Sequence, residues 1–125
     1  MNVANKLSTS LEDYLETIFI LNKERGEIRI TDIANAMEIS KPSVNKAVSS
    51  LKNQGLLTHQ KYGEIKLTKE GKELAQSIYF KHNTLVNFLT NKLGINKETA
   101  ENEACKIEHV ISSETLEKLI KYTLE

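Results

Sequence analysis

Apolar residues recur every three or four positions through most of the chain, which is the spacing of helices that bury one face. From residue 11 to residue 21 this pattern predicts a first helix, which Ser8 or Ser10 begins and Gly26 ends. A short extended segment is expected at residues 28–30. The dominance of helical spacing predicts a mainly α fold class.

Two shorter helices are expected next, with a tight turn between them. Thr31 is expected to cap the second helix, which closes after Met37. Ser40 is expected to cap the third, with Pro42 in its first turn and Gly55 after its end. Two helices joined in this way, the second carrying lysines and small polar residues, predict a helix-turn-helix.

The segment LLTHQKYGEIKLT follows and predicts two strands around a turn at Tyr62 and Gly63, the wing of a winged helix-turn-helix. This arrangement favours DNA binding. Asn45 and Lys46 suit base edges in the major groove, and the other polar residues suit phosphates or the minor groove. For any single lysine the alternative is a solvated surface charge. The residues expected to contact DNA are Lys41, Ser43, Asn45, Lys46, Ser49, Lys52, Lys61 and Lys66.

Three further helices are predicted in the second half of the chain. Thr68 is expected to cap a long helix that reaches about residue 92, Asn96 a fifth helix, and Ser112 or Ser113 a sixth. The last helices are too short to bury their apolar faces alone. A symmetric homodimer is the commonest way to cover such faces, so a second copy of the chain is the expected partner.

The charge distribution also divides the chain into two different parts. The 17 basic and 17 acidic residues cancel, but residues 40–69 hold six lysines against one glutamate, and residues 95–125 hold four lysines against seven glutamates. A basic middle and an acidic tail favour a polyanion-binding part joined to a part of another kind. The single cysteine excludes an internal disulfide, and no apolar run approaches the ~18 residues of a membrane span. A soluble, cytoplasmic protein is expected.

Cys105, Glu108 and His109 place three kinds of metal ligand within one turn of the predicted fifth helix. A thiolate, a carboxylate and an imidazole would therefore converge on one point. The alternative is a solvated helix face with a cysteine that packs as a small apolar residue. The motif alone leaves both interpretations open.

The chain resembles the metal-dependent bacterial and archaeal repressors typified by the diphtheria toxin repressor and the manganese transport regulator. The resemblance runs from SLEDYLETIFIL through ITDIANAMEISKPSVNKAVSSL, LTKEGKELA and KHNTLVNFL to NEACKIEHVIS. It implies a winged helix-turn-helix domain (1–70) and a helical metal-binding and dimerisation domain (71–125), without the SH3-like third domain of many members. It also implies a repressor that binds operator DNA as a metal-loaded dimer and controls metal homeostasis genes.

The resemblance implies a ligand set as well. Two carboxylates of the first helix match the manganese-type site, a histidine of the long helix matches the family's ligand histidine, and three residues match the fifth-helix ligands. The implied metal ligands are Asp13, Glu16, His82, Cys105, Glu108 and His109. Asp13 is manganese-like, whereas Cys105 stands where the iron-type repressors carry cysteine and the manganese regulators carry glutamate.

Two departures bear on the number and kind of metal ions. Val86 and Glu101 stand where the iron type's ancillary site has a glutamate and a histidine, so a two-metal cluster that uses Glu16 is favoured over that ancillary site. Mn(II) or Fe(II) is the expected co-repressor, because carboxylates and imidazoles suit both ions. A thiolate from Cys105 would favour Fe(II), Co(II) or Zn(II), and its backbone carbonyl would favour Mn(II).

Two other functions are weighed against this one. A winged-helix regulator with a vestigial metal site would respond to another signal. A small metalloenzyme would use the same donors to activate water. The sequence has no glycine-rich phosphate loop and no Ser/His/Asp arrangement, so we do not expect an enzyme.

Overall fold

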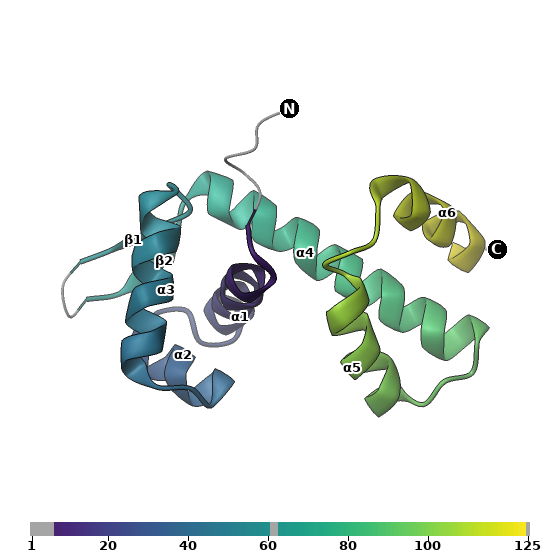
Figure 1. Cartoon of the computed structure of the whole chain (residues 1–125), viewed down its shortest axis with the longest axis horizontal. Coiled ribbons are helices and arrows are strands. Elements are labelled where there is room, and N and C mark those ends of the chain that lie inside the picture. The colour runs from purple at the N-terminus through teal and green to yellow at the C-terminus, as the bar shows by residue number, and fades with distance from the viewer. Residues whose placement is uncertain (1–6, 61–62, 125) are drawn as a thin grey trace. The chain divides into compact units, whose positions relative to one another are not determined.

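The computed structural model describes residues 7–60 and 63–124, which form six α-helices and one two-stranded sheet (Figure 1). The mainly α fold class is therefore confirmed. The chain divides into two compact units, residues 1–76 and 77–125, and the division falls inside helix α4 (Lys69–Asn87). The functional boundary after residue 70 stays a prediction. Among the described helices, none combines the length and the apolar composition that a membrane span requires.

Helices α1 (Thr9–Arg25), α2 (Ile30–Met37) and α3 (Lys41–Asn53) form the helical part of the first unit. Ser8 begins α1, because its side chain accepts a hydrogen bond from the Leu11 N–H at 3.1 Å. Gly26 ends α1 with φ +82°, as predicted. Ser40 begins α3 by accepting from the Ser43 N–H. Each of the three helices buries apolar side chains within this unit.

The start of α2 differs from the prediction. The helix begins at Ile30 rather than after Thr31, and Arg29 is its N-cap. The backbone N–H of Arg29 donates to the Asp32 carboxylate at 2.8 Å, and the Arg25 guanidinium donates to the same carboxylate at 3.2 Å. An acidic side chain at the third helical position thus secures the helix start, so a hydroxyl cap at Thr31 is not needed.

The wing consists of strands β1 (Leu57–His59) and β2 (Ile65–Leu67), which pair antiparallel with His59 opposite Ile65. The extended segment predicted at residues 28–30 is reduced to one bridge, in which Ile65 N–H donates to the Ile28 carbonyl at 2.9 Å. Of the predicted turn, Tyr62 lies outside the described residues. The two strands and the three helices together confirm the winged helix-turn-helix (Figure 1).

The second unit contains the end of α4, a π-helical turn η2 (Phe88–Lys92), α5 (Lys97–Ile107) and α6 (Ser113–Leu124). The long helix therefore reaches Lys92 as predicted, but its last turn is π-helical. Asn96 caps α5 by accepting from the Thr99 N–H at 2.9 Å, and Ser112 caps α6 by accepting from the Thr115 N–H at 3.1 Å. Ser112, not Ser113, is thus the cap of the last helix.

A small apolar cluster holds α4, η2 and α5 together. Its members share near-complete burial, and they are Leu85, Val86, Leu89, Ala100 and Ala104. The two alanines have no accessible surface, and they pack in one cluster with the apolar side chains of α4 and η2. This packing fixes the polar side chains that the two helices present to each other.

Candidate metal centre and nucleic-acid interface

Glu108 is the central polar residue of the second unit, and its side chain has no exposed surface. Its Oε1 lies 2.7 Å from Nδ1 of His82, and its Oε2 lies 3.8 Å from Nε2 of His109. Within the part of the chain that the structure describes, Oε2 has no hydrogen-bond partner. A buried carboxylate oxygen without a donor is costly. Binding of a cation would remove this cost.

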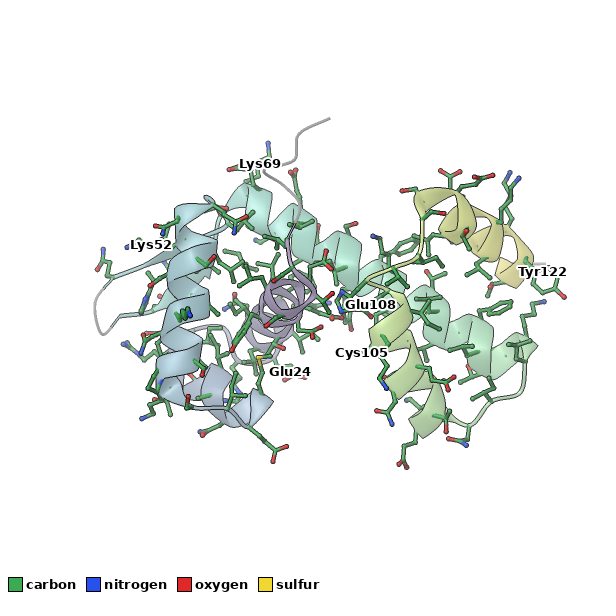
Figure 2. All side chains as sticks on the ribbon, in the orientation of Figure 1. Glu24, Lys52, Lys69, Cys105, Glu108 and Tyr122 are labelled. Atoms are coloured by element: carbon green, nitrogen blue, oxygen red, sulfur yellow. The ribbon has the colours of Figure 1, made fainter. Side chains whose placement is uncertain are left out.

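The end of α5 positions these donors. The helix ends at Ile107, and Glu108 follows with helical backbone angles (φ −59°, ψ −23°), so His109 lies just beyond the helix that was predicted to contain it. The three donors nevertheless lie close together, as their spacing in the sequence predicts. One ligand atom each from Cys105, Glu108 and His109 lie within 4.8 Å of one another. Figure 2 shows Cys105 and Glu108 on this segment.

His82 on α4 brings a second imidazole to Glu108 from the neighbouring helix. Its side chain is 14% exposed, and its Nε2 lies 2.9 Å from Oε2 of Glu101. Each ring nitrogen of His82 therefore faces a carboxylate. In the sequence, Glu101 stands out only as a departure from the iron-type pattern, and its contact with His82 was not predicted. The signal in the sequence is its position seven residues, about two helical turns, before Glu108.

The donor set of the second unit fits a divalent transition metal. It offers two imidazoles, one buried carboxylate and the exposed thiol of Cys105. Such a mixture suits Mn(II), Fe(II), Co(II) or Zn(II), whereas Mg(II) and Ca(II) prefer oxygen ligands alone. In the first unit, Asp13 and Glu16 lie one turn apart on α1, and Glu16 is buried. Their part in the metal site stays a prediction.

Helix α3 presents the polar face that the sequence predicts. Val44, Ala47, Val48 and Leu51 are buried in the first unit. The opposite face is exposed and holds the predicted DNA contacts Lys41, Ser43, Asn45, Lys46 and Ser49. An exposed polar face on the second helix of a helix-turn-helix is the surface that enters a major groove.

The predicted wing contacts have different surroundings. The Lys52 ammonium donates to the His59 carbonyl at 2.9 Å, so this lysine holds the wing. Lys66 is exposed and forms a long ion pair of 3.8 Å with Glu64. Lys61 lies outside the described residues. The DNA contacts themselves stay predictions.

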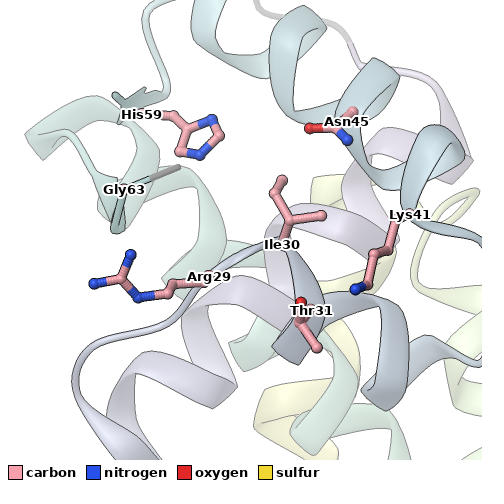
Figure 3. Close-up of a pocket in the computed structure, with 7 residues that line it drawn as sticks. All are labelled: Arg29, Ile30, Thr31, Lys41, Asn45, His59 and Gly63. Carbon is pink, nitrogen blue, oxygen red and sulfur yellow. The ribbon is translucent and has the colours of Figure 1, made fainter. Parts of the chain in front are cut away.

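A hollow of about 530 Å³ lies between the start of α2, helix α3 and the wing (Figure 3). Its polar lining includes Arg29, Thr31 and His59 beside the predicted contacts Lys41 and Asn45. Over the ranges that the structure describes, Nε2 of His59 is buried without a hydrogen-bond partner. Arg29 and His59 were not predicted from the sequence to lie beside these contacts. The cationic lining of the hollow is suited to an anion such as a phosphate.

Two family models match the chain. The model of the N-terminal DNA-binding domain of iron-dependent repressors matches residues 6–65. The model of the metal-binding and dimerisation domain of iron-dependent repressors matches residues 68–124. Between them, the two matches cover nearly the whole chain.

Individual proteins agree with these models. An HTH-type transcriptional regulator of Methanocaldococcus jannaschii is 40% identical over 114 residues, which are 90% of this chain and 91% of that protein. The HTH-type transcriptional regulator MntR of Geobacillus thermodenitrificans is 36% identical over 88% of this chain and 77% of its own length. The solved structure of the manganese regulator SloR superposes with a TM-score of 0.79 at 35% identity, over 90% of this chain. The chain spans about half of that structure, 52% of its length.

Proposed function

The chain belongs to the iron-dependent repressor family, and from this membership we propose that it is a divalent-metal-responsive transcriptional repressor. It binds operator DNA as a homodimer, with Mn(II) or Fe(II) as co-repressor, and controls genes of metal homeostasis in the cytoplasm. The family consists of transcriptional regulators, and we assign the chain no catalytic role. The observation that carries the proposal is Glu108, buried between two histidines with one carboxylate oxygen lacking a partner among the described residues.

The first unit supplies DNA binding. Asn45 and Lys46 on the exposed face of α3 would read adenine and guanine edges in the major groove. Arg29, Lys41 and His59 border the hollow beside this face. A DNA phosphate there would meet the positive charge of Lys41 and of Arg29, which also pairs with Glu27 at 2.7 Å. A dimer of such units would read a pseudo-palindrome, with half-sites one helical turn or a small multiple apart.

The second unit supplies the metal donors and the dimer surface. His82, Cys105, Glu108 and His109 would hold the ion, and Asp13 and Glu16 of α1 would complete its ligand set. When bound, the metal supplies positive charge that joins these donors. Regulation requires that the donors bind it more tightly in the arrangement that fits DNA than in other arrangements. For the dimer, exposed large apolar side chains of this unit are available, namely Phe80, Leu93, Val110 and Tyr122.

Among the metals, Mn(II) is our first choice and Fe(II) the second. Carboxylates and imidazoles form most of the proposed ligand set, and they suit both ions. The similarity to the manganese regulator SloR supports manganese. A role for the Cys105 thiolate would move the preference toward iron, cobalt or zinc.

The test begins with an operator, which we would select from a pool of random-sequence duplexes with the Mn(II)-loaded protein. Affinity for the selected duplex is then measured by fluorescence anisotropy with Mn(II), with Fe(II) under anaerobic conditions, and with chelator. We expect tight binding only with metal, and loss of the metal effect in His82→Ala and Glu108→Ala. Glu103→Ala, which removes an exposed carboxylate of the same helix, is the matched control. Equal affinity with metal and with chelator, or no enriched duplex, would contradict the proposal.

A further inference from the structure

His82 has a carboxylate at each ring nitrogen, and the two carboxylates differ in their surroundings. Glu108, at 2.7 Å from Nδ1, has a side chain without exposed surface, whereas Glu101, at 2.9 Å from Nε2, has a side chain that is 45% exposed. Only Glu108 also approaches a second histidine, His109. The Nδ1 side of the ring therefore faces the cluster of metal donors, and the Nε2 side faces outward.

Packing of α5 against α4 keeps one carboxylate at each ring nitrogen of His82. Glu101 and Glu108 are seven residues apart, which is a rise of about 10 Å along a helix. A flat imidazole ring with one carboxylate oxygen on each nitrogen spans most of that distance. The buried Ala104 on α5 and Val86 on α4 hold the two helices close enough for the ring to lie between both acids.

The two ring nitrogens of a histidine have distinct roles when one of them binds a metal. A neutral imidazole carries one N–H, and the nitrogen without hydrogen offers its lone pair to the ion. The remaining N–H of a metal-bound histidine usually donates to a carboxylate or a carbonyl, which fixes both the tautomer and the ring orientation. Glu101 lies where such an acceptor is needed if Nδ1 binds the metal.

We propose that Glu101 is a positioning residue for His82, and this inference rests on the proposed metal-dependent function. Its carboxylate accepts the Nε2 hydrogen of His82, so the lone pair of Nδ1 points to the metal position beside Glu108. Glu101 is not itself a ligand. Glu101 also lines an open hollow of about 620 Å³, together with residues such as Asn83 and Lys97.

The first test is metal affinity, measured for the full chain by competition between the protein and a fluorescent chelator for Mn(II). Glu101→Ala should weaken Mn(II) binding about 10- to 100-fold, which is the usual effect of losing an outer partner of a metal-bound histidine. Glu101→Gln keeps an acceptor oxygen and should lose less. Glu103→Ala removes the same charge from an exposed position on α5 and should bind Mn(II) like the unchanged protein.

The second test reads the tautomer directly. Long-range ¹H–¹⁵N NMR of the protein loaded with diamagnetic Zn(II) should show His82 bound through Nδ1 with its hydrogen on Nε2. Glu101→Ala should give a mixture of ring states, and Glu101→Gln should keep the single tautomer. A role in folding alone would leave the tautomer unchanged. If Glu101→Ala does not fold without metal, the comparison of Glu101→Gln with Glu103→Gln carries the test through Mn(II) affinity, which only Glu101→Gln should lower.

Unchanged Mn(II) affinity in Glu101→Ala, or equal weakening in Glu101→Ala and Glu103→Ala, would overturn the inference. So would a His82 bound to zinc through Nε2. These failures differ from failure of the proposed function. In that case the unchanged protein would bind its selected duplex equally with Mn(II) and with chelator, whatever the state of Glu101.

Discussion

The ammonium group of Lys52 donates a 2.9 Å hydrogen bond to the backbone carbonyl of His59 and so links the end of helix α3 to strand β1. Lys52 was predicted as a phosphate contact, but its charge already has a partner within the domain. The wing must keep a fixed position relative to α3 if both are to touch the same duplex. We therefore expect Lys52 to contribute to DNA binding by holding the wing as well as by its charge.

We expect Lys52→Met to lower both the stability of the first unit and its affinity for DNA. Loss of the hydrogen bond should cost about 1 kcal/mol or less of unfolding free energy, because the site is exposed. Thermal unfolding and anisotropy titration at several salt concentrations measure the two effects. Lys46→Met is the control, and it should weaken DNA binding without changing stability. Equal stability of the two variants would show that the link to His59 contributes nothing.

Gly71 in the first turn of α4 cannot carry a side chain without movement of its neighbours. A Cβ atom there would overlap the Leu56 carbonyl oxygen and lie 2.8 Å from its carbonyl carbon. The backbone of Leu56 has little freedom to yield, because its carbonyl also accepts a hydrogen bond from the Thr68 N–H at 3.1 Å. Close approach of these two backbones fixes where the long helix begins.

Gly71→Ala is therefore expected to destabilise the first unit by about 3 kcal/mol, at the upper end of the usual cost of overpacking. Gly55→Ala is the comparison, since Gly55 has φ +78° with no atom within 4 Å of a Cβ. Its cost, about 1–2 kcal/mol, should come from the left-handed backbone alone. Chemical denaturation of both variants provides the measurement. A smaller loss in Gly71→Ala than in Gly55→Ala would contradict the close approach.

Local patterns predicted the helices well because helix starts depend on a few neighbouring residues. Ser8, Ser40, Thr68, Asn96 and Ser112 each accept a hydrogen bond from the backbone N–H three residues later, as their positions before apolar runs predict. The π-helical end of the long helix carries no comparable signal in the sequence.

Thr31 shows where this local logic fails. A threonine and an aspartate stand side by side at the start of α2, and either can secure a helix start. Asp32, and not Thr31, secures the start of α2, because its carboxylate accepts hydrogen bonds from the Arg29 N–H and the Arg25 guanidinium. Arg25 belongs to the preceding helix. The choice therefore depends on a contact between helices, which local sequence does not contain.

The candidate site, too, could be predicted only where its contacts are local in sequence. Cys105, Glu108 and His109 could be grouped from their spacing alone, because one helical turn brings them together. The contact between His82 and Glu101 depends on how α4 packs against α5, so it could not be predicted from the spacing of residues along the chain. Burial of the Glu108 carboxylate, on which the proposed cation site depends, also arises from tertiary packing.

Metal should stabilise the protein, and Glu108 should be required for this effect. At a free Mn(II) concentration one hundred times the Kd, the unfolding free energy should rise by about 2.7 kcal/mol. Glu108→Gln keeps the side-chain volume and removes the charge, so its melting temperature should not respond to Mn(II). Glu103→Gln should respond like the unchanged protein. Differential scanning calorimetry with and without Mn(II) measures these shifts, and a full response in Glu108→Gln would remove Glu108 from the ligand set.

The thiol of Cys105 should decide which metal is preferred, because its sulfur lies within 4.8 Å of ligand atoms of Glu108 and His109. A thiolate ligand gives the Co(II)-loaded protein a sulfur-to-cobalt charge-transfer band in the near ultraviolet. Cys105→Ala should abolish that band and weaken Co(II) and Zn(II) about tenfold more than Mn(II), since soft ligands favour the former ions. Cys105→Glu should bind Mn(II) more tightly than Cys105→Ala does, and its Co(II)-loaded form should lack the band. Absence of the band in the unchanged protein, with equal Mn(II) affinity in Cys105→Ala, would instead leave the backbone carbonyl as the donor of this residue.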